Sequence, residues 1–270
     1  MKPAILFVAG LLFTSKIVPQ STFPVFPAVS VANASVADTS TWVAFQNPAC
    51  LAYSEKLNIG LLAESRYKIT IPTSESLTVS IPSDIVNTGI SLRYSGFSVW
   101  HDMYSGLAFA RNFSDKFALG LQLCLNSTYA FQSDSYYHTF LVQSGLLFPV
   151  GKNLHIGFQV FNMFNTSLKA SMLTYPLPAI YSLGCNWRAK KGFNIKLQAD
   201  KESGHNYRFA GGVDYQHNSK FLLQMGVYGF EYAVPVFGLG FHQGKFMYRL
   251  NNELHPMLGL ITRVGVSYSK

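Results

Sequence analysis

The residues with the greatest capacity for chemistry in this sequence are its cysteines, histidines and serines, and they form no recognised catalytic pattern. There is no G-x-S-x-G nucleophile turn, no H-E-x-x-H metal motif and no Walker loop for phosphate. Cys50, Cys124 and Cys185 are not accompanied by histidines at metal-site spacing. We therefore expect no catalytic residues, no metal and no cofactor, and a protein that is not an enzyme.

Two histidines have polar neighbours that could exchange a proton. His101 is followed by Asp102, and His217 precedes Ser219 by two residues. No motif places a serine nucleophile beside the first pair, and the second lies in a short connection between two apolar runs. We interpret His101 and Asp102 as the tip of an external loop, and His217 to Ser219 as a tight turn.

A stronger signal is an alternation that would place polar side chains on one face of a strand. From Phe117 to Asn126 the odd positions are large and apolar, and the even positions are small or polar. A period of two is typical of a β-strand with two different neighbours. Gln122 and Asn126 are therefore predicted to share the polar face, opposite apolar residues such as Leu121.

The alternation recurs along most of the chain. Fourteen strands are predicted, at residues 57–67, 75–82, 88–96, 103–113, 116–127, 137–149, 153–164, 178–188, 192–201, 205–216, 220–229, 233–242, 245–251 and 257–269.

The polar faces of these strands carry many charges. A sandwich core could not hold them unpaired, because each would cost several kcal/mol. A closed barrel in a membrane turns its apolar faces to lipid and keeps a polar interior. The sequence thus predicts an all-β fold, a 14-stranded antiparallel transmembrane β-barrel, rather than a soluble β-protein. The candidate lumen-facing polar residues are Gln122, Asn126, Lys196, Asp200, Arg208, Asp214 and Arg263.

The connections between the predicted strands alternate imperfectly between tight turns and longer loops. Bacterial outer-membrane barrels have short periplasmic turns and longer external loops. The order in which short and long connections alternate predicts that Asp115, Lys191 and Ser219, in short connections, face the periplasm. Thr73, Ser133 and Lys169, in the other set of connections, are predicted to face outside.

The N-terminal part of the chain has a different pattern. Residues 1–20 combine Lys2 with a short apolar run and are expected to be a signal peptide. Residues 21–55 are rich in small residues and proline and show little strand alternation, which predicts a short plug packed against the lumen wall. Residues 56–270 would form the barrel, so the expected location is the bacterial outer membrane.

The charge and cysteine content place few further limits. The net charge of +8 is spread along the sequence, often in turns, and does not indicate a nucleic-acid partner. A cationic pore interior is a lesser alternative. Three cysteines are too few for a disulfide framework.

One motif lies directly before the first predicted strand. The stretch from Val36 to Ala52 contains Asn47, Pro48 and Ala49, where asparagine can cap a turn and proline fixes φ. It resembles the segment that enters the barrel wall in the FadL superfamily. Two later stretches, Asn162 to Asn165 with Pro176 to Pro178, and Gly211 to Tyr215, resemble the PorV/PorQ-type barrels of Bacteroidota. That resemblance implies a fourteen-stranded barrel, which equals the number of predicted strands.

The resemblance implies two functions. The chain is short and has little material for a ligand-capturing external loop, which favours a non-catalytic accessory subunit of an outer-membrane secretion or assembly machine, like the type IX system. The alternative is FadL-like transport of small hydrophobic molecules. A general porin is the third choice. The expected partners are outer-membrane lipid, other outer-membrane or periplasmic proteins and, in the alternative, a hydrophobic ligand.

Overall fold

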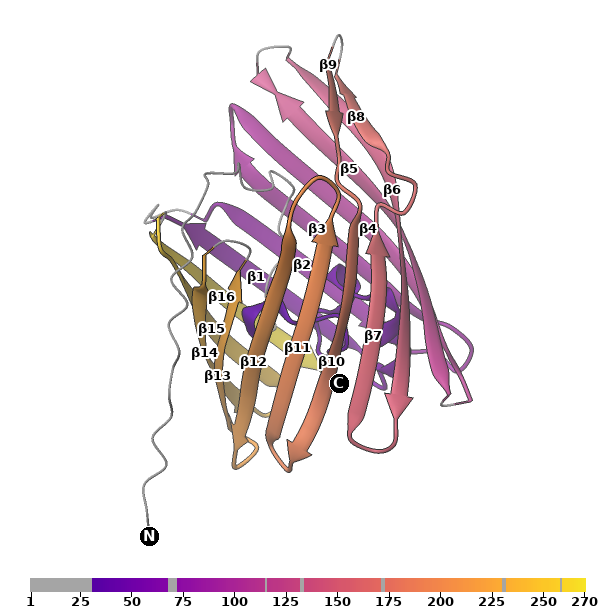
Figure 1. Cartoon of the computed structure of the whole chain (residues 1–270), viewed down its shortest axis with the longest axis vertical. Coiled ribbons are helices and arrows are strands. Elements are labelled where there is room, and N and C mark those ends of the chain that lie inside the picture. Colours follow the sequence, from indigo (N-terminus) through magenta and orange to yellow (C-terminus); the bar gives the residue numbers. More distant parts are fainter. Residues whose placement is uncertain are drawn as a thin grey trace.

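Fourteen antiparallel strands close into a single barrel in the computed structural model of the chain (Figure 1). The structure describes residues 31–67, 72–114, 116–131, 134–170, 173–229, 232–257 and 259–270. The first wall strand pairs with both the second and the last, which removes any free sheet edge. The predicted fold and its number of strands are confirmed.

The wall consists of consecutive antiparallel hairpins. Its strands are β1 (Asn58–Arg66), β2 (Ser74–Ile81), β3 (Asn87–Phe97), β4 (Trp100–Phe113), β5 (Phe117–Ala130), β6 (Ser135–Val150), β7 (Leu154–Phe161), β10 (Ile180–Lys190), β11 (Phe193–Glu202), β12 (Tyr207–His217), β13 (Phe221–Gly229), β14 (Val234–Gln243), β15 (Phe246–His255) and β16 (Gly259–Ser269).

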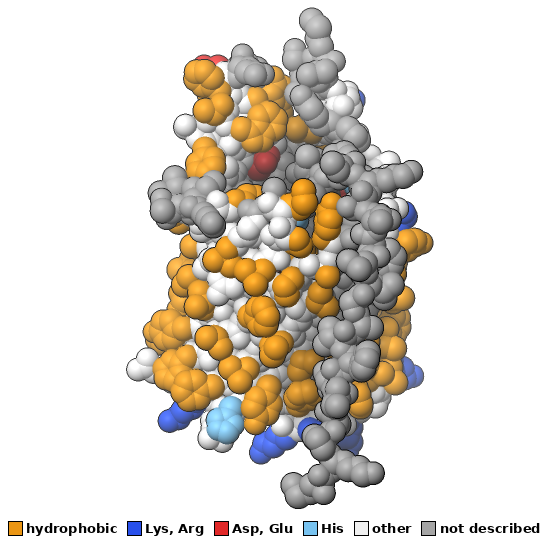
Figure 2. Space-filling model, turned by 60° about the vertical axis from the view of Figure 1, so that its left-hand side comes forward, with side chains coloured by type: hydrophobic (Ala, Val, Ile, Leu, Met, Phe, Trp, Pro, Cys, Tyr) orange, Lys and Arg blue, Asp and Glu red, His pale blue; other side chains and the backbone are white. Residues whose placement is uncertain are grey.

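Burial alternates along the strands as the sequence pattern indicates. On β5 the side chain of Leu121 is 44% exposed, whereas its neighbour Gln122 is fully buried. Apolar side chains cover much of the outer surface (Figure 2). The outward faces are therefore apolar, and the inward faces carry the polar residues.

The two ends of the barrel differ. Tight connections such as 190–193 and 217–221 lie at one end, the lower one in Figure 1, which we call the short-turn end. Lys191 and Ser219 lie there, and Thr73 and Lys169 lie at the opposite, long-loop end. Asp115 and Ser133 are outside the described residues. The side of the membrane that each end faces stays a prediction.

Three local expectations are wrong. The loop predicted from 165 to 177 contains a small hairpin of β8 (Ser167–Ala170) and β9 (Leu173–Pro176). β15 continues to His255 instead of ending at 251, because its polar stretch faces a polar lumen. His101 and Asp102 belong to β4 and not to a loop, since β4 and β5 pair as far as Trp100 and Ala130.

The described part of the N-terminal segment, residues 31–54, lies inside the barrel, and we call it the plug. It contains three 3₁₀ turns, η1 (Val31–Asn33), η2 (Val43–Phe45) and η3 (Pro48–Tyr53). η1 packs on β12, β13 and β14, and η3 packs on β3 to β6, across the lumen from them. The plug therefore crosses the lumen. The predicted signal peptide, 1–20, and residues 21–30 lie outside the described ranges.

No helix in the described ranges is long and apolar enough to span a membrane.

Candidate functional site

The Asn47, Pro48 and Ala49 turn attaches the plug to the wall. Asn47 caps η3, because its side-chain oxygen accepts a hydrogen bond from the Ala49 amide at 3.0 Å, and Pro48 starts the turn. The Asn47 side-chain amide donates to the carbonyls of Val36, at 2.7 Å, and of Leu146 on β6, at 3.0 Å. The same amide also donates to the Phe158 carbonyl on β7, at 3.4 Å, so this one side chain holds two parts of the plug and two wall strands together.

Wall side chains bond the plug backbone at several other places. Gln122 of β5 donates to the Ala44 carbonyl at 2.8 Å, and Gln143 of β6 donates to the Gln46 carbonyl. Further round the wall, on β11, the Gln198 side-chain oxygen accepts from the amides of Ser35 and Val36, at 2.7 and 2.9 Å. Asn87 of β3 donates to the carbonyls of Leu51 and Ser54. The plug has few regular internal hydrogen bonds, so these amides satisfy backbone groups that would otherwise be buried without partners.

A buried ion cluster joins the plug to the wall. The Lys196 ammonium lies 2.8 Å from a carboxylate oxygen of Asp38, in the plug, and 2.6 Å from one of Asp214, on β12. All three side chains are nearly inaccessible to solvent. We call this the plug cluster. Because Asp38 is the one charged residue between 31 and 54, it supplies the only ionic contact of the described plug.

Arg208 and Asp200 form a second contact near the plug. The Arg208 guanidinium bonds the Asp200 carboxylate at 2.6 and 2.7 Å and also donates to the Asn33 carbonyl at 3.3 Å. Asp200 in addition accepts from the Gln198 side chain at 2.7 Å. This pair therefore stabilises the wall beside η1 and touches the plug at one backbone atom.

Another buried ion cluster lies where the barrel closes. The Arg263 guanidinium of β16 pairs with Glu64 of β1 and with Glu253 of β15. Glu64 and Arg263 are direct partners in the register between the first and last strands. We call this the seam cluster, because it joins the two ends of the sheet.

The structure thus brings most of the candidate lumen residues together around the plug, but not all of them. Asn126 is buried and donates to Thr128 on its own strand, with no plug contact among the described hydrogen bonds. The sequence reasoning missed Asp38, Glu64 and Glu253. A signal for Asp38 was present, because a lone charge in an otherwise uncharged segment needs an opposite charge once it is buried.

Apolar side chains surround the middle of the plug. Trp42 and Phe45 of the plug form one buried cluster with wall residues that include Tyr104, Leu141 and Phe161. The rings of Phe45 and Tyr104 lie 6.1 Å apart between centroids. Aromatic and aliphatic side chains of the plug and the wall are therefore in contact at this level of the lumen.

Two inward glycines bring the wall very close to the plug. A Cβ atom added at Gly120 would lie 2.3 Å from backbone atoms of Pro48 and Ala49, and one at Gly157 would lie 2.1 Å from the Val36 carbonyl oxygen. Side chains at these positions would have to displace the plug backbone. The absence of side chains is what lets the plug fit.

The plug also buries a thiol. Cys50 lies on η3, and burial, together with the charge of Asp38, raises the pKa of its thiol well above the ordinary value. The thiol therefore stays protonated and can donate to the Val36 carbonyl, 3.5 Å away. All three cysteines are free, as the sequence indicates.

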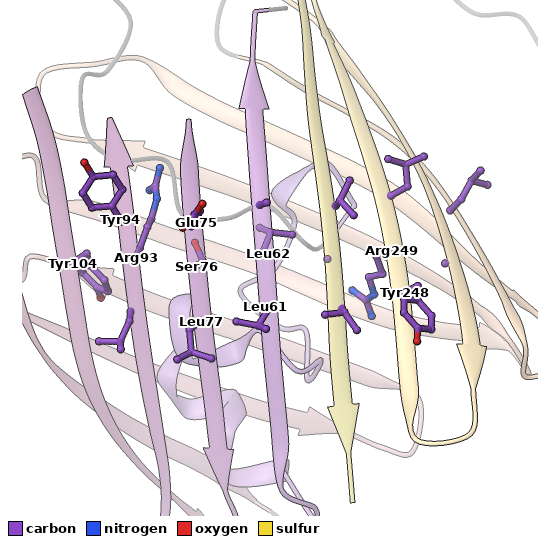
Figure 3. Close-up of a pocket in the computed structure, with 18 of the residues that line it drawn as sticks. Leu61, Leu62, Glu75, Ser76, Leu77, Arg93, Tyr94, Tyr104, Tyr248 and Arg249 are labelled. Atoms are coloured by element: carbon purple, nitrogen blue, oxygen red, sulfur yellow. The ribbon is translucent and has the colours of Figure 1, made fainter. Parts of the chain in front are cut away.

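The wall from β13 through β16 and β1 to β5 carries an apolar hollow of about 1400 Å³ (Figure 3). Neighbouring residues of its lining differ in exposure, since Leu61 is 53% exposed and Leu62 only 6%. Its lumen-facing members, such as Tyr104, are nearly all buried, so the open space lies on the outer side. The hollow is thus a feature of the apolar outer face and not a chamber in the lumen.

Known structures share this fold over most of their length. The toluene transporter TodX of Pseudomonas putida matches with a TM-score of 0.64 and 11% identity, over 84% of this chain and 93% of TodX. A Pseudomonas aeruginosa FadL homologue matches with a TM-score of 0.63 and 11% identity, over 88% and 96%. The CymD monoaromatic hydrocarbon channel matches with a TM-score of 0.60 and 10% identity, over 91% and 99%.

These likenesses give the chain the fold of the FadL-type barrels. No protein-family model matches the sequence, and no curated protein is significantly similar to it.

Proposed function

We propose that this protein is an outer-membrane channel for small hydrophobic molecules and that the plug is its gate. The observation that carries the proposal is a lumen closed by a packed plug, in a barrel that shares its fold with hydrocarbon channels. The predicted signal peptide would direct export, and the apolar outer face would contact membrane lipid.

A closed lumen argues against a general porin. Porins of 16 to 18 strands leave an aqueous channel, whereas here the plug crosses a narrower barrel and is hydrogen-bonded to Arg208 of β12 on one side and to Asn87 of β3 on the other. Any molecule that follows the lumen must wait for the plug to shift. The route is therefore gated.

The lining of the lumen suggests the class of molecule. Movement of the plug would separate Trp42 and Phe45 from Tyr104, Leu141 and Phe161, and would expose aromatic and aliphatic surface. Such a surface favours small apolar or aromatic compounds over sugars and ions, because burial of apolar area supplies the free energy of binding. The solved relatives that transport toluene and monoaromatic hydrocarbons make these compounds the first substrates to test.

The accessory role in secretion, which the sequence motifs favoured, becomes the second hypothesis. It rests on the resemblance of other stretches, such as Asn162 to Asn165 and Gly211 to Tyr215, to PorV/PorQ-type barrels, and the structural likenesses support transport instead. Purification in mild detergent distinguishes the two hypotheses. A stoichiometric outer-membrane or periplasmic partner would favour the accessory role.

The direct test is uptake of radiolabelled toluene by cells with and without the protein. A disulfide between plug and wall supplies the gating control: a Cβ at Gly89 would lie 3.1 Å from the Ala44 Cβ, near the 3.5 to 4.5 Å of a disulfide. The pair Ala44→Cys/Gly89→Cys is made in a chain whose three native cysteines are replaced by alanine.

We expect the oxidised pair to lose uptake and dithiothreitol to restore it. The single variant Gly89→Cys should not respond to oxidation. Equal uptake with and without the protein would contradict a transport function. Uptake that persists in the oxidised pair would contradict gating by the plug.

A further inference from the structure

Exposed cationic side chains gather at the short-turn end of the barrel. Figure 2 shows Lys and Arg along the lower edge of the molecule. Of the described acidic residues, only Glu55 and Asp84 are exposed at this end, whereas the exposed charges of the long-loop end are Glu75, Asp134 and Lys169. The exposed cations of the short-turn end are Lys56, Arg111, Lys116, Lys152, Arg188, Lys190, Lys191, Lys220, Lys245 and Lys270.

The turns that carry these lysines are joined in series. Backbone hydrogen bonds of 2.7 Å run from Arg188 to Asn153, from Gln216 to Gly192 and from His242 to Lys220, and a bond of 3.0 Å runs from Ser269 to Lys245. Successive hairpins are two strand spacings apart, about 10 Å. This distance is close to the Debye length of about 8 Å at physiological ionic strength, so the fields of neighbouring lysines overlap. We call Lys152, Lys190, Lys191, Lys220 and Lys245 the basic rim.

An aromatic belt lies directly beside the basic rim. The ring centroids of Phe221 and Phe241 lie 5.3 Å apart, as do those of Phe246 and Tyr268, and all four rings are on outward positions. The Lys245 ammonium lies 6.0 Å from the centroid of the Tyr268 ring. Aromatic side chains at the end of an apolar face mark the level of the lipid headgroups. The lysines of the basic rim therefore reach that level.

We propose that the basic rim binds the phosphate groups of anionic phospholipids in the leaflet at the short-turn end. Lysine ammoniums on long apolar stems can reach headgroup phosphates while their stems lie along the aromatic belt. Glu55 precedes β1 and is followed by the exposed Lys56, and Asp84 precedes β3, so the two exposed acids are outnumbered by the ten exposed cations of this end. The proposal rests on the membrane placement in the proposed function and not on the transported molecule.

The test counts lipids bound to the folded protein by native mass spectrometry. The purified barrel in nonionic detergent receives equal amounts of phosphatidylglycerol or phosphatidylcholine. We expect the wild type to bind more phosphatidylglycerol than phosphatidylcholine. The triple variant Lys190→Gln/Lys220→Gln/Lys245→Gln should lose this preference. Each lysine removed should weaken the preference about fivefold, since a lysine near an anionic surface contributes about 1 kcal/mol.

The matched control is Lys169→Gln, an exposed lysine at the long-loop end, which should retain the preference. The preference should also vanish in 1 M salt, where the Debye length is about 3 Å. Equal binding of the two lipids by the wild type, or an unchanged preference in the triple variant, would overturn the proposal and leave an acidic protein as the partner to seek. Toluene uptake by the triple variant, measured separately, tests the channel function independently.

Discussion

The plug cluster and the seam cluster have the same chemistry and join different parts of the molecule. Each places a buried cation between two buried carboxylates. Each also has an arginine as a second cation: Arg249 acts on both carboxylates of the plug cluster, and the partly exposed Arg66 pairs with Glu64 of the seam cluster. The plug cluster joins residue 38 to the wall, whereas the seam cluster joins β1 to β15 and β16. One therefore holds the segment proposed as the gate, and the other holds the closed sheet. Similar ion clusters can serve gating in one place and stability in another.

The difference lies in where an unpaired charge can go. A carboxylate in the plug can move to water if the plug shifts, but carboxylates on two paired wall strands stay where the sheet holds them. Loss of a buried partner is costly mainly because it leaves the remaining charge desolvated. Breaking the plug cluster should thus change the position of the plug, and breaking the seam cluster should change the stability of the barrel.

The largest effect is expected for Arg263→Met. The substitution leaves Glu253 buried with only a hydrogen bond from the Tyr228 hydroxyl, at 2.9 Å, and leaves Glu64 with the partly exposed Arg66, at 2.5 Å, which should destabilise the barrel by about 3 kcal/mol. Urea unfolding, followed by heat-dependent migration on gels, measures the loss. Lys191→Met, an exposed residue at the short-turn end, is the control and should stay within about 0.5 kcal/mol of wild type. A stable Arg263→Met barrel would mean that the seam cluster does not hold the closure.

Lys196→Met makes the corresponding change in the plug cluster. Asp214 keeps a hydrogen bond from Gln224, at 2.9 Å, and Asp38 can leave with the plug. We expect the closed position of the plug to lose about 2 to 3 kcal/mol, with a smaller change in barrel stability. Planar-bilayer recordings should show roughly a hundredfold more frequent opening. A channel that stays closed in a barrel of reduced stability would show that Lys196 has the same role as Arg263.

The sequence indicated which residues face the lumen better than it indicated their partners. The period of two assigned Lys196, Asp214 and Arg263 to the inner face, because each strand has only two faces. Pairing depends on how the barrel closes: Glu64 and Arg263 are 199 positions apart in sequence. No local pattern contains that information. The end of β15 was missed for a related reason, since Asn251 and Glu253 face a polar lumen and interrupt the apolar signal.

Gly157→Ala tests the fit between plug and wall without changing a charge. The new methyl group would collide with the Val36 carbonyl, so the plug must move, at a cost of about 1 to 3 kcal/mol. Conductance should rise while the unfolding midpoint of the barrel changes little. Gly211→Ala is the control: its nearest neighbour would be a Leu197 methyl at 3.2 Å, and the plug is not among its close contacts. Equal conductance in the two variants would show that the plug tolerates the collision.

The smallest and most selective change is from acid to amide, made once in each cluster. Asp38→Asn keeps the size of the side chain and an oxygen that can accept from Lys196, and the ion pair between Lys196 and Asp214, at 2.6 Å, remains. Only one charge is lost, so the closed position of the plug should be destabilised by about 1 kcal/mol. The channel should then open severalfold more often, at unchanged stability of the barrel.

Glu64→Gln is the same substitution in the seam cluster. Its neighbours are wall residues, and Arg263 keeps Glu253 as a partner. This variant should therefore lower the stability of the barrel by about 1 kcal/mol, similar to the effect of Asp38→Asn on the closed position of the plug. The channel should stay closed. Each variant is the control for the other, measured by both urea unfolding and bilayer recording. If both variants changed the same observable, the plug and the wall would form one cooperative unit, and the plug could not act as a separate gate.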